Sequence, residues 1–312
     1  MSWKTLLITN YDKLSLKNGL LMVTNLKAKK ELYFAMNDLN CVVLENNYTT
    51  LTTQVLSKLV ENNVYLIICD DKYEPNGLIM SFHNHWKPLT IFENQIKLQN
   101  YQKEQLWKLV VEKKIENSIN VMGMLGCSQR SLTMMSNFFN TVKLNDASNR
   151  EALAAKVFFR ELYGSSFLRF SEDIINAALN YGYTILASAI SRTLVKYGLH
   201  CFLGIFHKGK TNNWNLSYDL VEPFRPMVDL WVSTNIESLL ANETLHYQHR
   251  LELINLLNQS VVIDEKIHTV TNAIEIVVKS YYTYLKTASL TKLKLPTIVQ
   301  FEERSSLDET EE

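Results

Sequence analysis

The second half of the chain contains the stretch His207-Lys-Gly-Lys-Thr-Asn-Asn-Trp-Asn-Leu-Ser-Tyr-Asp-Leu-Val-Glu-Pro-Phe-Arg-Pro-Met-Val-Asp229. It combines one histidine with three carboxylates, several basic residues and two prolines. A loop at His207 leads into a short helical pattern in which Asp219 and Glu222 stand three apart, so their carboxylates share a face. Pro223 disfavours helical geometry at Glu222, and we expect the helix to end or kink there. The stretch predicts that an imidazole and carboxylates converge on one hard cation.

Helical periodicity surrounds this stretch from about Tyr101 onward. Two of the predicted helices have clear ends, because one is followed by Gly164 and another by Gly198. We therefore expect an all-α domain over residues 102–301. Its helices are predicted near residues 106–110, 132–139, 148–163, 174–197 and 264–284.

Residues 1–95 instead read as short strands. Asn18-Gly19 lies between two apolar segments and is a strong signal for a β-hairpin. A helix is predicted from about residue 50, a buried strand over 64–68, and a turn at Pro75-Asn76-Gly77. The predicted fold class is α+β, with a small N-terminal β domain followed by a larger all-α domain.

The composition is that of a globular protein, because 46% of the 312 residues are apolar and can form a large core. No apolar run approaches the roughly 18 residues that cross a bilayer, and the N-terminus lacks signal-peptide features, so we expect a cytoplasmic protein without a membrane partner. The net charge is zero, which counts against a protein that grips nucleic acid over its whole surface. Residues 302–312 hold six acids and one arginine and are expected to form an acidic disordered tail. The rest of the chain is then mildly basic.

Glu151 admits two interpretations. It stands at the third position of a Ser-x-x-Glu pattern, where its carboxylate would only satisfy a backbone N–H in a capping box. Alternatively, it is a metal ligand. Taken singly, His207, Asp219 and Glu222 also fit purely structural roles. The apolar neighbours within 214–231 indicate burial, however, and buried carboxylates need a cation or many donors, which favours a shared cation.

A polar seam follows one of the predicted apolar helices. Asn176, Asn180 and Tyr183 recur at helical spacing on it. The seam can be a hydrogen-bond network that fixes helix packing, or it can contact the groups that surround a metal ion. Both interpretations stay open.

Two further histidines form a weaker candidate site. His83 and His85 would share one face of a strand and could bind a metal, but nothing nearby supplies further ligands. We expect them to be surface or turn residues.

Four motifs occur in order along the chain: Asn149-Arg-Glu151-Ala-x-Ala-Ala-Lys156, Asn176-x-Ala-Leu-Asn-Tyr-Gly-Tyr183, Leu203-Gly-Ile-x-His207 and Asn215-Leu-x-x-Asp-Leu-x-Glu222-Pro-Phe-Arg-Pro226. They closely resemble the motifs of the CRISPR spacer-acquisition integrases, the Cas-one family. The residues within the motifs are similar to those of the type II branch. The resemblance spans nearly the whole chain. It implies a β-sandwich-like N-terminal domain that dimerises (1–95) and a helical metal-dependent catalytic domain (102–301).

By this resemblance, Glu151, His207 and Glu222 match the family's catalytic and metal-binding triad, with Glu222 standing where other branches have Asp. The implied activity is that of an integrase and endonuclease that inserts foreign DNA fragments, the spacers, into a CRISPR array. The implied partners are double-stranded DNA and a dimer of the small Cas-two protein, which bridges two homodimers. The type II branch also works with a ring-shaped adaptation protein and the effector nuclease. The acidic tail matches no family function.

The residues themselves suit this chemistry. Attack of a DNA 3′-hydroxyl on a phosphodiester is assisted by a divalent cation, which neutralises charge and activates the attacking oxygen. Two carboxylates and one imidazole accept Mg²⁺ and suit Mn²⁺ better. We expect the residues behind these ligands to be Asp219, Asn180 and Tyr183. Candidates to hold DNA phosphates, each of which could also be an ordinary surface residue, are Lys208, Lys210, Arg225, Arg192 and Arg169.

Two other functions stay open at this point. One is a structure-specific nuclease that acts on branched or single-stranded DNA without integration. The other is a non-enzymatic helical scaffold, in which Glu151 is a cap, His207 a core residue and the polar seam a packing network.

Overall fold

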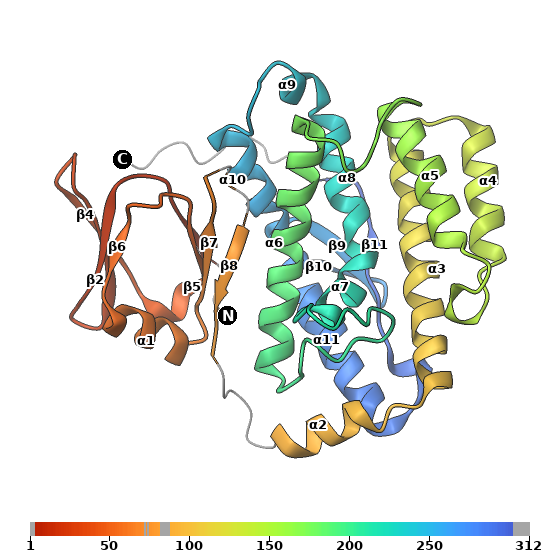
Figure 1. The fold of residues 1–312 in the computed structure, drawn as a ribbon, viewed down its shortest axis with the longest axis horizontal. Coiled ribbons are helices and arrows are strands. Elements are labelled where there is room, and N and C mark those ends of the chain that lie inside the picture. Colours follow the sequence, from red (N-terminus) through yellow and green to blue (C-terminus); the bar gives the residue numbers. More distant parts are fainter. Residues whose placement is uncertain (1–3, 72, 74, 82–87, 302–312) are drawn as a thin grey trace.

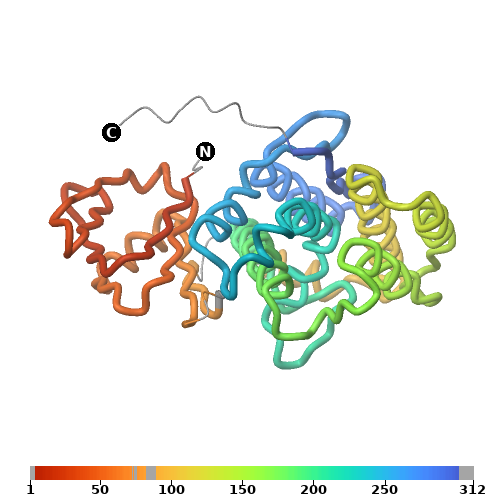
Figure 2. Tube along the Cα trace, turned by 90° about the horizontal axis from the view of Figure 1, so that it is seen from above, coloured from red at the N-terminus to blue at the C-terminus, as the bar shows by residue number. Residues whose placement is uncertain are grey.

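The computed structural model describes residues 4–71, 73, 75–81 and 88–301. Its N-terminal strands lie beside a larger, mainly helical part, and both views show the two parts next to each other (Figures 1 and 2). This arrangement confirms the predicted α+β fold class. The acidic tail predicted at 302–312, and the candidate pair His83 and His85, lie outside the described residues.

Two four-stranded sheets form the N-terminal part, with strand orders β1-β5-β7-β8 and β4-β3-β2-β6. Their strands are β1 (Lys4–Ile8), β2 (Asp12–Lys17), β3 (Leu20–Asn25), β4 (Lys30–Phe34), β5 (Leu39–Leu44), β6 (Thr50–Leu51), β7 (Tyr65–Cys69) and β8 (Pro75–Ile79). The sheets and helix α1 (Thr53–Glu61) enclose an apolar core, which includes Leu14, Leu21, Val42 and Val55. Two sheets around one core correspond to the sandwich-like arrangement that the resemblance implies.

Local turn signals in this part were partly right. Asn18 and Gly19 have φ of 51° and 79° and join β2 to β3, as a two-residue hairpin turn requires, so the predicted hairpin is confirmed. The turn predicted at Pro75-Asn76-Gly77 is wrong, because these residues begin β8, the edge strand that pairs with β7. Proline is tolerated at the first position of an edge strand, where it removes no essential ladder hydrogen bond.

The sheet that contains β5 and β7 is buried on both faces. Side chains alternate along each strand, so that Val42 and Leu66 belong to the N-terminal core whereas Val43 and Ile67 belong to the core of the helical part. This explains why both strands are almost continuously apolar. The two parts of the molecule are therefore packed directly on each other.

Helix α6 (Ile174–Lys196) lies at the centre of the helical part. It packs against α7 (Asn215–Val221), α8 (Arg225–Thr234), α10 (Tyr247–Asn255) and α11 (Val270–Thr287). A Cβ at Gly182 would lie 2.5 Å from Val228, so the glycine allows α8 to approach closely. Gly164 and Gly198 follow α5 and α6 with φ of 90° and 72°, which confirms the predicted helix ends. The remaining helices are α2 (Pro88–Ile96), α3 (Asn100–Met124), α4 (Gln129–Asn140), α5 (Arg150–Tyr163) and α9 (Ile236–Leu240), with 3₁₀ turns η1 (Met36–Asp38), η2 (Leu144–Asp146), η3 (Glu222–Phe224), η4 (Leu256–Asn258) and η5 (Leu290–Lys292).

The helical part also contains a small sheet that the sequence did not predict. Strands β9 (Ser260–Ile263), β10 (Lys266–Thr269) and β11 (Thr297–Ile298) pair in the order β10-β9-β11. The last long helix therefore begins at Val270 and not near residue 264. Asp264 and Glu265 form the hairpin turn, with φ of 51° and 62°. None of the helices in the described residues combines the length and the apolar character of a membrane span.

Candidate metal centre

Asp219 organises the loop that carries His207. This fully buried carboxylate on α7 accepts hydrogen bonds at Oδ2 from the backbone N–H groups of Ile205 and Phe206, at 2.5 and 3.1 Å. Its Oδ1 accepts from the His207 N–H at 3.1 Å and lies 2.7 Å from His207 Nδ1. A Cβ at Gly204 would lie 2.9 Å from Asp219 Oδ2, which is why the loop needs glycine there. Asp219 thus fixes both the loop and the imidazole ring.

The His207 side chain is 39% exposed and its ring lies edge-on to Trp107, with centroids 5.9 Å apart. The hydrogen bond to Asp219 raises the pKa of His207 above its usual value, although partial burial acts the other way. The charge of Glu222 also raises this pKa, and the charge of Arg225 lowers it. Because Nδ1 faces Asp219, the nitrogen that points away from it is Nε2, the atom with which histidine commonly binds a metal.

Glu222 lies where the chain breaks between α7 and α8, as Pro223 predicts, and is only 2% exposed. The Pro223 carbonyl, which the break leaves without a helical partner, accepts a hydrogen bond from Asn117 Nδ2 at 2.7 Å. Arg225 Nη1 lies 3.3 Å from Glu222 Oε1. Burial raises the pKa of Glu222, but Arg225 and Lys114 outweigh it and hold the pKa below its usual value. Glu222 is therefore a buried, ionised carboxylate.

Glu151 stands in the first turn of α5 but does not form a capping box. Asp146 takes that role, since its carboxylate accepts hydrogen bonds from the backbone N–H groups of Arg150 and Glu151 at 2.8 and 3.0 Å. The Ser148 hydroxyl bonds to a carbonyl upstream of the helix instead. The capping interpretation of Glu151 is wrong, and its carboxylate is directed toward α3.

Lys114 on α3 joins the two glutamates. Its Nζ lies 2.6 Å from Glu151 Oε1 and 2.5 Å from Glu222 Oε2. Burial lowers the pKa of Lys114, but the two carboxylates raise it above its usual value overall, so the ammonium group stays charged. Sequence reasoning missed this residue. One signal was available, because Lys114 stands midway between the buried positions Val110 and Ser118 at helical spacing.

The carboxylates of Glu151 and Glu222 and the imidazole of His207 are groups that can bind a divalent cation. Two carboxylates converge on one positive charge, and the ammonium group of Lys114 takes the place that a cation would have between them. Glu222 Oε2 lies 2.5 Å from Lys114 Nζ and has no other polar partner among the described residues. As the side chains stand, no three acidic, histidine or cysteine groups of the described residues are close enough to hold a metal ion. An ion bound by both glutamates would have to displace Lys114 from between them.

The polar seam of α6 contacts groups other than the three candidate ligands. Asn176 Oδ1 and Asn180 Oδ1 each accept a hydrogen bond from Arg169 at 2.9 Å. The Tyr183 hydroxyl donates to Asp229 Oδ1 at 2.8 Å. Burial raises the pKa of Asp229 to about 7. These contacts fit a packing network. The Tyr183 ring also lies 4.8 Å from the guanidinium of Arg225, which pairs with Glu222, so the seam reaches a group next to a candidate ligand as well.

Two cavities border the candidate centre and bring together most of the basic residues predicted to hold phosphates. One, of about 290 Å³, is lined by residues that include Lys114, Glu151, Arg169, Tyr183 and Arg225. The other, of about 420 Å³, is lined by residues that include Lys103, His207, Lys208 and Lys210. Arg192 lies elsewhere, in a cavity between the two parts of the molecule.

The sequence of this chain is similar to those of known proteins. The family model described as "CRISPR associated protein Cas1" matches residues 6–262. The "CRISPR-associated endonuclease Cas1" of Neisseria meningitidis serogroup C (strain 8013) is 32% identical over 306 residues, which cover 97% of this chain and 99% of that protein.

Two solved structures share the fold. A casposase bound to an integration product aligns with a TM-score of 0.76 at 21% identity, over 92% of each chain. A chain of a Cas6-RT-Cas1–Cas2 complex aligns with a TM-score of 0.75 at 16% identity, over 96% of this chain and 36% of that one. Because the family model spans most of the sequence and the Neisseria protein matches it almost from end to end, this chain belongs to the Cas1 family of CRISPR-associated endonucleases and integrases.

Proposed function

We propose that this protein is a metal-dependent DNA integrase with endonuclease activity that inserts foreign DNA fragments into a CRISPR array. The observation that carries the proposal is the convergence of Glu151 and Glu222 on one buried positive charge. A histidine whose Nδ1 is held by Asp219, and whose pKa is raised by the charge of Glu222, supports it. Two carboxylates and one imidazole accept Mg²⁺ and suit Mn²⁺ better, since nitrogen ligation favours the softer ion.

Glu151, His207 and Glu222 would hold the ion, which when bound would neutralise charge at the phosphoryl centre and activate the attacking 3′-hydroxyl. Asp219 keeps the imidazole oriented through Nδ1, so that Nε2 is the nitrogen available to the ion. Arg225 keeps Glu222 ionised, because their side chains pair at 3.3 Å. A carboxylate that stays ionised binds a divalent ion more strongly than a protonated one.

The DNA backbone would cross the centre between the two bordering cavities. Lys103, Lys208 and Lys210 surround His207 on one side, and Arg169 and Arg225 lie on the other. Basic side chains of this kind position phosphates without reading sequence. The net charge of zero predicts weak, salt-sensitive binding of DNA by the isolated protein and stronger binding in a larger assembly.

The partners that we propose are suggested by the solved structures with the same fold. The casposase is bound to an integration product, and the other neighbour is a complex that contains Cas2. We propose that this protein acts on double-stranded DNA as a homodimer formed by the N-terminal β domain, and that two such dimers assemble with a Cas2 dimer. The motif wording additionally favours the type II adaptation protein and effector nuclease as partners.

A strand-transfer assay tests the function. The protein and Cas2 are incubated with Mn²⁺, a supercoiled plasmid that carries a repeat array, and a short duplex with free 3′-hydroxyl ends. We expect joined products, and none from a matched duplex with 3′-dideoxy ends. His207→Ala should abolish joining while size-exclusion chromatography shows an unchanged oligomer.

The products distinguish the proposal from its competitors. Plasmid cleavage without joining, with either duplex, would indicate a nuclease that does not integrate. Activity that does not depend on metal, or normal joining by His207→Ala, would remove the proposed centre.

A further inference from the structure

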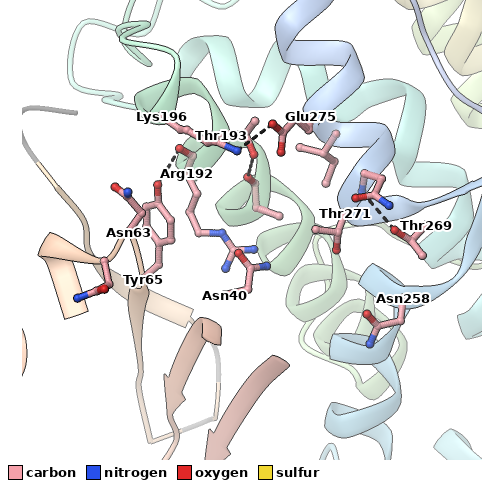
Figure 3. Close-up of a pocket in the computed structure, with 14 residues that line it drawn as sticks. Asn40, Asn63, Tyr65, Arg192, Thr193, Lys196, Asn258, Thr269, Thr271 and Glu275 are labelled. Carbon is pink, nitrogen blue, oxygen red and sulfur yellow. Dashed lines mark hydrogen bonds and ion pairs between the residues drawn. The ribbon is translucent and has the colours of Figure 1, made fainter. Parts of the chain in front are cut away.

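A polar cavity of about 420 Å³ lies between the two parts of the molecule (Figure 3). Strands β5 and β7 contribute to it from the N-terminal part, and α6 and the start of α11 contribute from the helical part. Most of its lining is amide or hydroxyl side chains, among them Asn40, Asn62, Thr193 and Thr271. It shares no lining residue with the two cavities at the candidate metal centre.

Arg192 brings a buried positive charge to this cavity. Its side chain extends from α6 toward Asn40 (Figure 3), and the residue is only 3% exposed. Its ring contact is with a neutral group, since the guanidinium lies 5.2 Å from the centre of the Tyr65 ring. Among the described residues, no carboxylate lies within ion-pair distance of it. A buried charge without a counter-charge is costly, so the site suits an anion.

The acidic residue in the lining does not supply that counter-charge. Glu275 Oε1 accepts hydrogen bonds from Lys196 Nζ at 2.8 Å and from the Tyr197 hydroxyl at 3.2 Å. Its charge is therefore matched by Lys196. The charge of Arg192 remains for a ligand.

The start of α11 provides a second, independent preference for an anion. This helix has 18 residues, and Thr269, Thr271 and Asn272 at its first turn line the cavity. The N-terminus of a helix carries partial positive charge that favours phosphate. The N–H groups of Val270 and Asn272 already donate to the Gln259 carbonyl and the Thr269 hydroxyl, so it is the partial charge that acts here. The helix end and Arg192 thus face the same space.

We propose that this cavity binds a phosphate monoester of nucleotide size. A guanidinium matches a phosphate by paired hydrogen bonds, and a volume of about 420 Å³ leaves room for more than the phosphate. Amides and hydroxyls from Asn40, Asn62 and Thr193 would meet the polar remainder of the ligand. The ligand would contact both parts of the molecule. The proposal goes beyond DNA integration and does not depend on the metal centre.

Equilibrium dialysis with labelled deoxyadenosine monophosphate tests the site. The full-length protein is used in EDTA, so that metal-mediated binding at Glu151 and Glu222 is removed. We expect saturable binding of one nucleotide per chain. Arg192→Gln should weaken it at least tenfold, whereas Arg130→Gln, at an exposed position of α4, should not.

Asn40→Asp provides a variant that keeps the size of the side chain. It places a carboxylate beside Arg192, so we expect nucleotide binding to be lost and the melting temperature of the ligand-free protein to rise. Asn137→Asp on the exposed face of α4 adds the same charge elsewhere and should bind as the unchanged protein does. Because Asn40→Asp should be more stable, its loss of binding cannot be attributed to unfolding.

Competition identifies the source of the phosphate. Displacement of the label by a short duplex with 5′-phosphate ends, but not by the same duplex with 5′-hydroxyl ends, supports a DNA end as the ligand. Displacement by neither duplex supports a free nucleotide. The proposal is overturned if the unchanged protein shows no saturable binding, or if Asn40→Asp binds as tightly as Asn137→Asp.

Discussion

Two buried clusters of charge in this molecule have different designs. The first joins the two parts: Glu45 Oε1 accepts hydrogen bonds from Arg250 Nε at 2.7 Å and from the Tyr181 hydroxyl at 2.9 Å. Arg250 also donates to the Leu245 carbonyl. One acid thus meets one base, and both side chains are almost fully buried. This is the arrangement of a structural ion pair.

The second cluster shares one ammonium group between two carboxylates. Lys114 lies within 2.6 Å of both Glu151 and Glu222, beside a cavity of about 290 Å³ and a partly exposed His207. Each cluster has one carboxylate oxygen without a hydrogen bond among the described residues, Glu45 Oε2 in the first and Glu222 Oε2 in the second. This feature therefore does not distinguish them. The second cluster differs in three respects. One ammonium group is shared by two carboxylates, the charge of Glu222 acts on the pKa of His207, and a cavity adjoins Lys114 and Glu151. The first cluster is one acid matched by one base, whereas the second lies beside a cavity and is where we propose that a divalent ion binds.

The largest expected effect is on activity at the second cluster. Glu222→Gln removes a charged ligand, so strand transfer should fall by about a thousandfold or more. The strand-transfer assay with the 3′-hydroxyl duplex measures this. Glu116→Gln is the matched control on the exposed side of α3 and should leave activity unchanged. Residual activity of Glu222→Gln within tenfold of the unchanged protein would show that this carboxylate is not a ligand.

Metal rescue separates the two clusters directly. Lys114→Met leaves Glu151 and Glu222 without the ammonium group that they share. Arg250→Met leaves Glu45 without its basic partner. In EDTA, Arg250→Met should lower the free energy of unfolding by about 3–5 kcal/mol, because the buried Glu45 loses its partner. Lys114→Met should lower it by less, because Arg225 still pairs with Glu222. Mn²⁺ should restore the free energy of unfolding of Lys114→Met but not that of Arg250→Met, as measured by urea unfolding. Equal rescue of both variants, or of neither, would erase the distinction.

Asp219→Asn should have a smaller effect, about 10- to 100-fold on strand transfer, because the residue orients His207 without binding the ion. The substitution should also lower the pKa of His207, which the Asp219 bond raises above 6.5. In metal-free protein, the protonated pair stabilises the fold below pH 6.5 and loses that contribution as the pH rises through the higher folded-state pKa. NMR titration of the imidazole checks both values. A His207 pKa that is the same in both proteins would contradict the proposed orientation.

The smallest effect is expected at the exposed lysines. Lys208→Ala with Lys210→Ala should weaken DNA binding a few-fold and reduce the slope of log affinity against log salt by about 2, one phosphate contact for each lysine. Fluorescence anisotropy at several salt concentrations measures the slope. Lys27→Ala with Lys29→Ala, on an exposed loop of the N-terminal part, is the control. Identical slopes for the two double variants would place the DNA elsewhere.

Local signals in the sequence predicted much of the fold. The Asn18-Gly19 hairpin and the helix ends at Gly164 and Gly198 depend on backbone conformations that glycine and asparagine adopt easily, so they are visible in a few residues. The hairpin at Asp264-Glu265 was missed because these residues carry the same left-handed geometry without a glycine. Pro75 was misread because only pairing with β7 shows that it begins an edge strand.

The candidate site was only partly visible in the sequence. The spacing of Asp219, Glu222 and Pro223 indicated a kinked helix with converging carboxylates, and the structure has that kink. Glu151 looked like a cap because the alternative cap, Asp146, reaches the helix through a left-handed turn that no local pattern revealed. Lys114 is 37 residues from Glu151 along the chain, and only packing of α3 against α5 and η3 brings them together.

Calorimetric titration of Mn²⁺ tests the central claim, that Glu151, His207 and Glu222 bind one divalent ion. The unchanged protein should show one site per chain. Each of Glu151→Gln, His207→Ala and Glu222→Gln should weaken that site at least tenfold, while Glu116→Gln should not. If any one of the three variants binds Mn²⁺ as tightly as the unchanged protein does, that residue is not a ligand and the proposed metal centre is wrong.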